Sequence, residues 1–428
     1  MPACLRKRPG RRFYMKDNMS TIEQKALAYH RAGSAGKIAI EVTKSVSTQD
    51  DLALAYSPGV AAPCVEISRE PTKAYEYTAK GNLVGVITNG SAVLGLGNIG
   101  ALAGKPVMEG KVVLFKKFAG IDAFDIEIDE QDPDKLVDII AALHPTFGGI
   151  NLEDIKAPEC FYIERKLRER LAIPVFHDDQ HGTAIVVGAG LLNALEMTRR
   201  AIGDIKIVCS GAGAAAIACL ELLVDLGAQR KNIYVCDSKG VLTKSRALDG
   251  EKAEWAQDTD AVSLSDVMAG ADMFLGVSGP GVLSQADVQK MAKAPIVFTL
   301  ANPEPELRPE LVREVAADAI IATGRSDYPN QINNALCFPY LFRAALDSGA
   351  KGINQEMKRA CVVALADMAR SDARFGKDYI VPGLLDPRLL SGVTPKIATA
   401  AWNSGVARKH LVEAEYAADL SDLAESLI

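Results

Sequence analysis

The sequence predicts an α/β protein of two domains: a smaller N-terminal α/β domain and a Rossmann-type, doubly wound nucleotide-binding domain. Three observations lead to this prediction. The chain has 428 residues, the length of about two ordinary domains. Short apolar runs alternate with amphipathic segments, as in parallel α/β proteins. One strand–turn–helix unit, which starts at Asp204, carries the spacing G-x-G-x-x-A.

The composition excludes several classes of protein. Its 48% hydrophobic and 24% charged residues are ordinary for a globular chain in water. The formal net charge of −6 argues against general nucleic-acid binding. The eight cysteines are scattered without C-x-x-C spacing, so we expect neither a zinc knuckle nor a disulfide framework, and a reducing, cytoplasmic compartment fits. No apolar run reaches membrane-spanning length, and no membrane partner is expected.

The chain is expected to divide into three parts. Residues 1–18 form a basic arm without an apolar segment behind it, so it is not a secretory signal. We expect this arm to be disordered; an organelle-targeting segment or an upstream start site are the alternatives. Residues 19–180 are expected to form the N-terminal domain. Its first segment, Ser20 to Gly33, is predicted to be a short helix. Residues 181–428 are expected to form the Rossmann domain and C-terminal helices.

The segment LALAYSPGVAAP contains residues typical of a helix start. Ser57 suits the N-cap and Pro58 the first helical position. Because the first N–H groups of a helix attract anions, the backbone after Ser57, including Gly59, is predicted to bind a substrate carboxylate. Taken by itself, the preceding Tyr56 is most simply a half-buried tyrosine at a strand end.

The stretch Gly95–Gly100 matches G-x-G-x-x-G, yet we interpret it as a tight turn beside the site and not as a dinucleotide motif. The motif should open a helix. Here Gly104, Pro106 and Gly110 interrupt the following segment, which leaves room for only about two helical turns. The next run is rich in strand-forming residues, and Lys111 is expected at its start.

Two acidic pairs follow short apolar runs: Glu153-Asp154 after GGINL, and Asp178-Asp179 after IPVF. Such runs are typical of buried parallel strands, and ligands in open α/β sheets bind beyond the carboxyl ends of strands. Carboxylates from two neighbouring strands would suit Mg²⁺ or Mn²⁺. The alternative is that each pair caps a helix beside a solvated neighbour.

His177 and His181 are four residues apart, a spacing that can place two imidazoles on one helix face for zinc. Pro174 and the strand-like PVF indicate instead that His177 ends a strand. No cysteine or third histidine lies nearby in the sequence. We therefore do not predict zinc.

The second glycine motif has the full context of a dinucleotide site. The strand IKIVCS precedes Gly211–Ala216, an amphipathic helix follows, and the strand NIYVCD ends with Asp237. An acid at that place usually holds the ribose hydroxyls of NAD. Ser238 and Lys239 follow it, and Lys239 could bind a 2′-phosphate, which favours NADP and leaves NAD as the alternative.

Two asparagines follow later elements of the same domain. Asn302 comes directly after the strand TLA, over the expected nicotinamide position, and Asn334 precedes an apolar helix. Turn formation is the alternative role of each. From Asn354 onward the chain is predicted to be helical, with one Pro/Gly-rich loop.

With these motifs placed, the chain closely resembles the malic enzymes, in particular the bacterial NADP-dependent type related to a bifunctional subgroup. The matching segments span roughly residues 37 to 400: AYSPGVAAPC, VLGLGNIGALAGKPVMEGK, FGGINLEDIKAPECFYIE, PVFHDDQHGTA, SGAGAAAIAC, VCDSKGV, LANPEPE and TGRSDYPNQINNALCFP. The resemblance implies oxidative decarboxylation of L-malate to pyruvate and CO₂, with NADP⁺ reduced and Mg²⁺ or Mn²⁺ required. It also implies a homodimer or a higher homo-oligomer.

The resemblance further implies roles for single residues. Tyr56 would be the general acid and Lys111 the general base, and the metal ligands would be Glu153, Asp154 and Asp179. Substrate contacts are expected at Ser57, Gly59, Asp178, Asn302 and Asn334. Cofactor contacts are expected at Val93, Gly211, Ala212, Gly213, Ala214, Ala215, Asp237, Ser238, Lys239, Asn302 and Asn334. As the base, Lys111 must be neutral near pH 7, which requires a pKa well below that of a free lysine.

Two departures from the family pattern matter. Larger-subunit malic enzymes carry an arginine where this chain has Ala92, followed by Val93. Bifunctional relatives continue into a phosphotransacetylase-like domain, so we expect either a single-function form or a fragment. The alternatives to a malic enzyme are a catalytically silent dinucleotide-binding subunit and a dehydrogenase that acts on another 2-hydroxy acid without decarboxylation.

Overall fold

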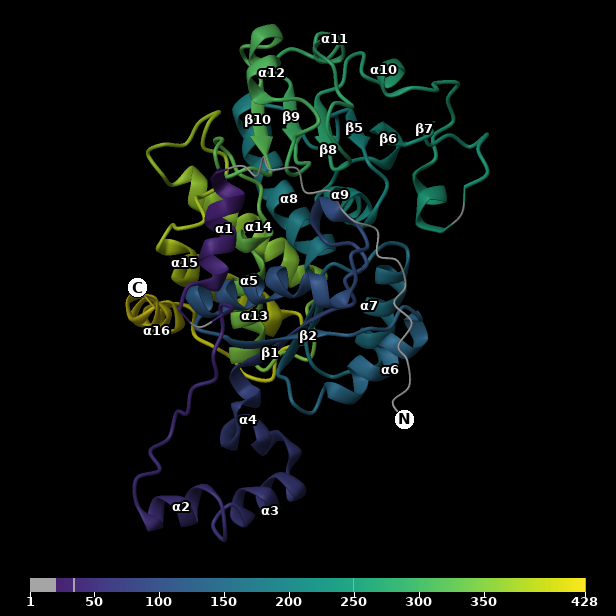
Figure 1. Ribbon diagram of the computed structural model, residues 1–428. Helices are drawn as coiled ribbons and strands as arrows, with labels where there is room; N and C mark the ends of the chain where they lie inside the picture. The colour runs from purple at the N-terminus through teal and green to yellow at the C-terminus, as the bar shows by residue number, and fades with distance from the viewer. Residues whose placement is uncertain (1–20, 34, 249, 428) are drawn as a thin grey trace, which may run out of the picture. The chain divides into compact units, whose positions relative to one another are not determined.

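The computed structural model describes residues 21–33, 35–248 and 250–427 (Figure 1). The basic arm predicted for residues 1–18 lies outside the described residues. The chain forms two compact units, which divide after Glu41. In the first, α1 (Thr21–Arg31) confirms the predicted helix, and the His30 ring bonds the Ala26 carbonyl. The second unit, from Val42 onward, contains both sheets.

A four-stranded parallel sheet lies in the N-terminal half of the larger unit. Its order is β2-β1-β3-β4. The bounds are β1 (Leu83–Thr88), β2 (Asp122–Glu127), β3 (Gly149–Leu152) and β4 (Val175–His177). Strands β1 and β3 are buried along their whole length, as their apolar runs predict. The helices α6 (Pro133–Leu143) and α7 (Glu159–Arg170) pack Ile140 and Leu167 into a shared core with Ile150.

Helix α5 (Ala101–Ala119) contradicts the prediction for its segment. It is one helix of 19 residues that continues through Gly104, Pro106 and Gly110. The expected limit of two turns and the expected strand at Lys111 are therefore wrong. Tertiary packing explains the difference: Phe115 is fully buried, with edge-to-face contacts to Phe338 and Phe342. Burial of such a face outweighs the unfavourable helix propensity of glycine and proline.

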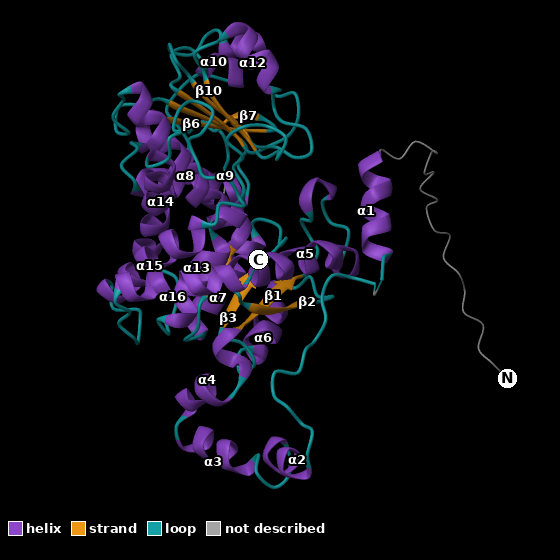
Figure 2. Ribbon diagram, turned by 90° about the vertical axis from the view of Figure 1, so that its left-hand side faces the viewer, coloured by secondary structure: helices purple, strands orange, loops and turns teal. Residues whose placement is uncertain are grey.

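The second sheet has the order β10-β9-β8-β5-β6-β7. All its neighbouring pairs are parallel except β6 and β7. The bounds are β5 (Ile207–Ser210), β6 (Ile233–Asp237), β7 (Gly240–Val241), β8 (Met273–Gly276), β9 (Ile296–Thr299) and β10 (Ile320–Thr323). Five of these strands lie where the sequence predicts them, while the short β7 was not predicted. Together with α9 (Ala214–Asp225), they form the expected Rossmann-type domain (Figure 2).

Helix α8 (Asp178–Thr198) starts four residues before the predicted start at Gly182. It runs without a break across the domain boundary predicted between residues 180 and 181. Its small residues permit close packing: a Cβ at Gly188 would lie 3.1 Å from Leu226 and 3.4 Å from Val362 of α14 (Gln355–Arg370).

The predicted C-terminal helices are confirmed. They are α13 (Phe338–Asp347), α14, α15 (Arg388–Asn403) and α16 (Glu413–Ser426). The remaining α-helices are α2 (Gln49–Ala55), α3 (Ala61–Arg69), α4 (Ala74–Tyr77), α10 (Leu264–Val267), α11 (Gln285–Val288) and α12 (Pro309–Val315). Within the described ranges, no helix is long and apolar enough to cross a membrane.

Candidate active site

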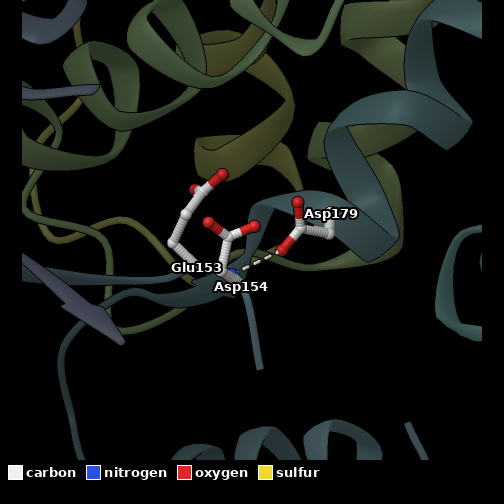
Figure 3. A group of neighbouring side chains, drawn as sticks. All are labelled: Glu153, Asp154 and Asp179. Carbon is white, nitrogen blue, oxygen red and sulfur yellow. Dashed lines mark hydrogen bonds between the residues drawn. The ribbon is translucent and has the colours of Figure 1, made fainter. Parts of the chain in front are cut away.

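The two acidic pairs meet at one edge of the first sheet. Strands β3 and β4 are parallel neighbours, with Leu152 opposite His177, so the residues that follow them lie side by side. Glu153 and Asp154 follow β3, and Asp179 lies in the first turn of α8. One carboxylate oxygen from each of these three residues lies within 4.8 Å of the others (Figure 3). The Asp154 backbone N–H also donates to Asp179 Oδ2 at 2.8 Å.

This carboxylate cluster carries more negative charge than its protein surroundings balance. Burial and mutual repulsion raise the pKa of Asp154 to about 9 and that of Glu153 to about 7. Burial likewise raises the pKa of Asp179 to about 6. Asp154 Oδ2 is buried without a hydrogen-bond partner among the described residues. Two buried carboxylates and the partly exposed Asp179 form a set of hard oxygen ligands with unbalanced charge, which fits a divalent cation such as Mg²⁺ or Mn²⁺.

Lys111 of α5 reaches into the same cluster. Its Nζ lies 2.6 Å from Asp178 Oδ2, 3.0 Å from Glu153 Oε1 and 4.3 Å from the centre of the Phe338 ring. Burial alone would lower the pKa of Lys111, but Asp178 and Glu153 outweigh it and raise this pKa above its usual range. Lys111 is therefore not made neutral near pH 7 by the protein residues around it, as the role of general base requires. A cation bound by Glu153 would repel the ammonium and oppose this rise.

Asp178 and Asn334 lie together at the start of α8. Burial raises the pKa of Asp178 to about 7, and the neighbouring Lys111 and Asn334 oppose that rise. Gly182 makes this arrangement possible: a Cβ there would lie 2.1 Å from Asp178 Oδ1 and 2.8 Å from Asn334 Cβ. Asn302, which follows β9, does not share this position. It packs against Gly324, and a Cβ added to Gly324 would lie 2.5 Å from Nδ2 of Asn302.

The first glycine cluster lies beside the acidic pair. The Ala92 N–H donates to the Asp154 carbonyl at 2.9 Å, and Gly97 and Gly100 adopt left-handed φ values of 72° and 85°. The cluster therefore forms the tight turn that we predicted next to the site. The Val93 side chain is fully buried within this turn. It cannot contact a cofactor unless the turn moves.

A cavity of about 660 Å³ lies at the second glycine motif. The predicted cofactor residues that line it are Gly211, Ala212, Gly213, Asp237 and Ser238. The other predicted cofactor residues are not among those lining it: Val93, Ala214, Ala215, Lys239, Asn302 and Asn334. Ala157, Pro158 and Phe161, which precede or belong to α7, close one side of the cavity.

Two cations that the sequence analysis missed surround Asp237. Arg246 Nη2 donates to both carboxylate oxygens, at 3.0 and 2.9 Å. Lys252 Nζ lies 3.6 Å from Oδ2 and lines the cavity. Burial would raise the pKa of Asp237, but Arg246 and the Lys239 N–H lower it overall. No motif marks Arg246 or Lys252, because only the fold of the loop after β7 brings them to Asp237.

Tyr56 does not join the cluster in this structure. Its side chain is 72% exposed, and no residue of α2 or α3, the helices on either side of it, is buried. The described contacts of Lys111 Nζ are with Asp178, Glu153 and Phe338, and do not include Tyr56. Figures 1 and 2 both show α2 and α3 away from β1, the neighbour of β3 in the first sheet.

The helix start predicted at Ser57 is wrong. Helix α3 begins at Ala61 with Val60 as its N-cap, and Ser57-Pro58 lies in the preceding turn with a cis peptide bond. The amides after Ser57 are already bonded: Gly59 N–H donates to the Ala53 carbonyl at 2.8 Å, and Val60 N–H to the Tyr56 carbonyl. They are therefore not free for a substrate carboxylate in this arrangement.

Two family models match the chain. The one described as "Malic enzyme, N-terminal domain" matches residues 35–168, and "Malic enzyme, NAD binding domain" matches residues 180–403. The second match confirms that the dinucleotide unit is the one containing Gly211–Ala216. The first glycine cluster was therefore rightly set aside, although the reason was wrong, because that cluster does open a long helix.

Individual proteins similar to this chain are also malic enzymes. The chain is 60% identical to an NADP-dependent malic enzyme of Escherichia coli (strain K12), over 92% of this chain and 54% of that protein. It is 57% identical to an NAD-dependent malic enzyme of Rhizobium meliloti (strain 1021), over 91% and 52%. It spans about half the length of these two relatives. The solved malic enzyme of Pyrococcus horikoshii Ot3 superimposes with a TM-score of 0.88 and 44% identity, over 95% of this chain and 97% of that one.

Proposed function

The chain belongs to the malic enzyme family, and on that premise we propose that it oxidatively decarboxylates L-malate to pyruvate and CO₂ with reduction of NADP⁺, dependent on a divalent cation. One observation carries the proposal: a buried lysine touches a cluster of buried carboxylates, with Lys111 Nζ 2.6 Å from Asp178. A base beside a cation site suits proton removal from a hydroxyl group whose carbon then loses a hydride.

Glu153, Asp154 and Asp179 would hold Mg²⁺ or Mn²⁺. When bound, such a cation acidifies the C2 hydroxyl group of malate and withdraws electron density from the C2 oxygen during decarboxylation. Asp178 is not part of this ligand set in our proposal. It holds the Lys111 ammonium, and it helps to exclude water because it is fully buried.

Lys111 Nζ is the group that accepts the proton of the C2 hydroxyl. The domain that contains the 660 Å³ cavity would hold NADP⁺, which would supply the acceptor for the hydride that leaves C2. Asn334 lies beside Asp178 and can donate its amide to a malate oxygen, and Asn302 is proposed to face the nicotinamide. Proton removal by Lys111 requires that its raised pKa falls when cation and substrate are present.

Tyr56 is proposed to protonate C3 after CO₂ has left. This role requires the segment that contains α2 and α3 to approach Lys111, because Tyr56 is exposed in the structure. The same segment exposes Leu52, Leu54, Val60 and Val65. Exposed apolar side chains grouped on short helices are typical of protein interfaces, and we propose that the chain forms a homodimer or a higher homo-oligomer.

NADP is proposed as the preferred cofactor. Arg246 occupies both oxygens of Asp237, so this carboxylate is a poor acceptor for ribose hydroxyls. Lys252 lines the cavity and can bind a 2′-phosphate. Glu251 also lines the cavity and opposes this preference in part, so some reaction with NAD⁺ is expected.

The test is L-malate-dependent reduction of NADP⁺ and NAD⁺, measured in parallel with Mn²⁺ and with EDTA. We expect NADPH, pyruvate and CO₂ in equal amounts, and no reaction with EDTA. NADPH formation without CO₂ would replace the proposal with a dehydrogenase that does not decarboxylate. Cofactor binding without turnover would indicate a silent subunit, and turnover in EDTA would refute the metal requirement.

A further inference from the structure

The histidine pair that the sequence left without a role meets a single carboxylate. Glu164 of α7 is buried, with 5% of its surface exposed. Its Oε1 accepts a hydrogen bond from the His177 backbone N–H at 3.1 Å. Both of its oxygens contact Nε2 of the His181 ring, at 3.0 and 2.9 Å.

The network continues beyond His181. Nζ of Lys358, a buried residue of α14, lies 3.1 Å from His181 Nδ1. Because an ammonium group only donates, Nδ1 is the acceptor and Nε2 carries the hydrogen that bonds Glu164. Both ring nitrogens are therefore occupied, which excludes His181 as a zinc ligand in this arrangement. The Phe176 ring, 5.3 Å away, packs beside the imidazole.

The bonds of Glu164 lie on both sides of the acidic pair Asp178-Asp179 in the sequence, and its helix connects them to the pair Glu153-Asp154. His177 precedes Asp178-Asp179 and His181 follows them, so Glu164 holds the first turn of α8 at both ends. Its own helix, α7, begins at Glu159, shortly after Asp154. One carboxylate thus ties the segment that follows the first acidic pair to the turn that carries the second.

We propose that Glu164 is a positioning residue that sets the separation between Asp154 and Asp179 at which both can bind one divalent cation. The inference rests on the proposed metal site. Carboxylates that repel one another need a rigid frame if they are to stay close without a cation. Buried charged groups add little stability compared with apolar packing. Glu164 and Lys358, which are joined through the His181 ring, are therefore poorly explained as core residues alone.

The experiment measures Mn²⁺ binding to the full chain by electron paramagnetic resonance of free Mn²⁺. In Glu164→Gln the side chain keeps its size and an acceptor for the His177 N–H, but loses the negative charge that faces the His181 ring and attracts Lys358 on the far side of that ring. We expect the Kd for Mn²⁺ to rise about tenfold or more, as when outer partners of metal ligands are removed. Saturating Mn²⁺ should restore most of kcat, because the reacting groups are unchanged.

The matched control is Asn193→Ala. Asn193 is also a buried residue of α8, and it bonds the carbonyls of Ala366 and Ile380 at 3.0 and 2.8 Å, without contact to Glu164. This variant should lose thermal stability and keep the wild-type Kd for Mn²⁺. An unchanged Kd in folded Glu164→Gln, or an equal rise in Asn193→Ala, would overturn the inference.

A second variant keeps the inference testable if Glu164→Gln does not fold. His181→Ala removes one of the two anchors and retains the bond from the His177 N–H to Glu164. Its Kd for Mn²⁺ should rise by a smaller factor, and a wild-type Kd would again overturn the inference. A wild-type chain that binds no Mn²⁺ would instead refute the metal site on which the inference rests.

Discussion

Lys111 and Asp178 form a buried ion pair of 2.6 Å between α5 and the first turn of α8. The two residues are 67 positions apart in the chain, and neither has more than 7% of its surface exposed. The pair joins the proposed base to the helix that carries a proposed metal ligand.

Replacement of Lys111 by alanine should strongly lower turnover without preventing metal binding. Loss of a positioned base lowers turnover by roughly 10²–10⁴-fold. Because Lys111 is the cation that now neutralises the cluster, its removal should leave Mn²⁺ binding no weaker than in the wild type. Steady-state kinetics and Mn²⁺ titration test both statements. The control is Lys105→Met, which removes another lysine of α5, paired with Asp125 outside the cluster.

Stabilisation by Mg²⁺ should increase from pH 6 to pH 9. The pKa of Asp154 is raised from 3.8 to about 9, so the folded state holds a proton that the unfolded state has lost. This contribution to stability is lost as the pH rises towards 9. Glu153 and Asp179, whose pKa values are raised to about 7 and about 6, lose their contributions in the same direction at lower pH. Mg²⁺ binds the deprotonated groups. Thermal unfolding with Mg²⁺ or EDTA across this range provides the measurement, and a shift independent of pH would contradict it.

The choice between NADP and NAD should depend on Lys252. Lys252→Ala should weaken binding of NADPH by about tenfold, the usual effect of losing a charge-assisted hydrogen bond, while NADH binding stays nearly unchanged. The intrinsic fluorescence of the reduced cofactors reports both affinities. Lys239→Ala is the comparison, since Lys239 was predicted from the sequence but does not line the cavity. If only Lys239→Ala weakens NADPH binding relative to NADH binding, the proposal that Lys252 binds the 2′-phosphate is wrong.

Gly182→Ala should lower activity although alanine favours a helix. The new Cβ would overlap Asp178 Oδ1 at 2.1 Å, so the carboxylate that holds Lys111 must move. We expect a fall in kcat of at least about tenfold, corresponding to a rise of ~1.4 kcal/mol in the barrier. Gly104→Ala in α5 is the control, because its Cβ would meet Val93 at an ordinary 3.5 Å. Equal kinetics for Gly182→Ala and the wild type would contradict the close approach.

Tyr56→Phe should lower turnover and leave cofactor and metal binding intact. The phenolic hydroxyl is the only group removed, and Tyr56 is exposed, so the fold should not change. NADPH fluorescence and Mn²⁺ titration should match the wild type, while kcat for pyruvate formation falls. Tyr77→Phe, at another exposed tyrosine, the last residue of α4, serves as the control. Full activity of Tyr56→Phe would remove this residue from the mechanism.

The sequence predicted those elements whose signal is local. The apolar runs before Glu153 and Asp178 identified β3 and β4, and the strand context of Gly211 identified the dinucleotide unit. Parallel strands end at the same edge of a sheet, so the meeting of the two acidic pairs followed from their positions after these strands. The prediction that His177 ends a strand is likewise confirmed, because β4 ends at His177.

By itself, the sequence determined the family, the two sheets and the carboxylate cluster, since each depends on patterns within a short stretch of chain. Only the tertiary structure decided that α5 continues through Pro106, that Arg246 and Lys252 reach Asp237, and that Tyr56 lies exposed on its segment. The physical reason is the same in each case. Burial of Phe115, the path of the loop after β7 and the packing of α2 and α3 depend on residues far apart in the chain, which local propensity does not encode.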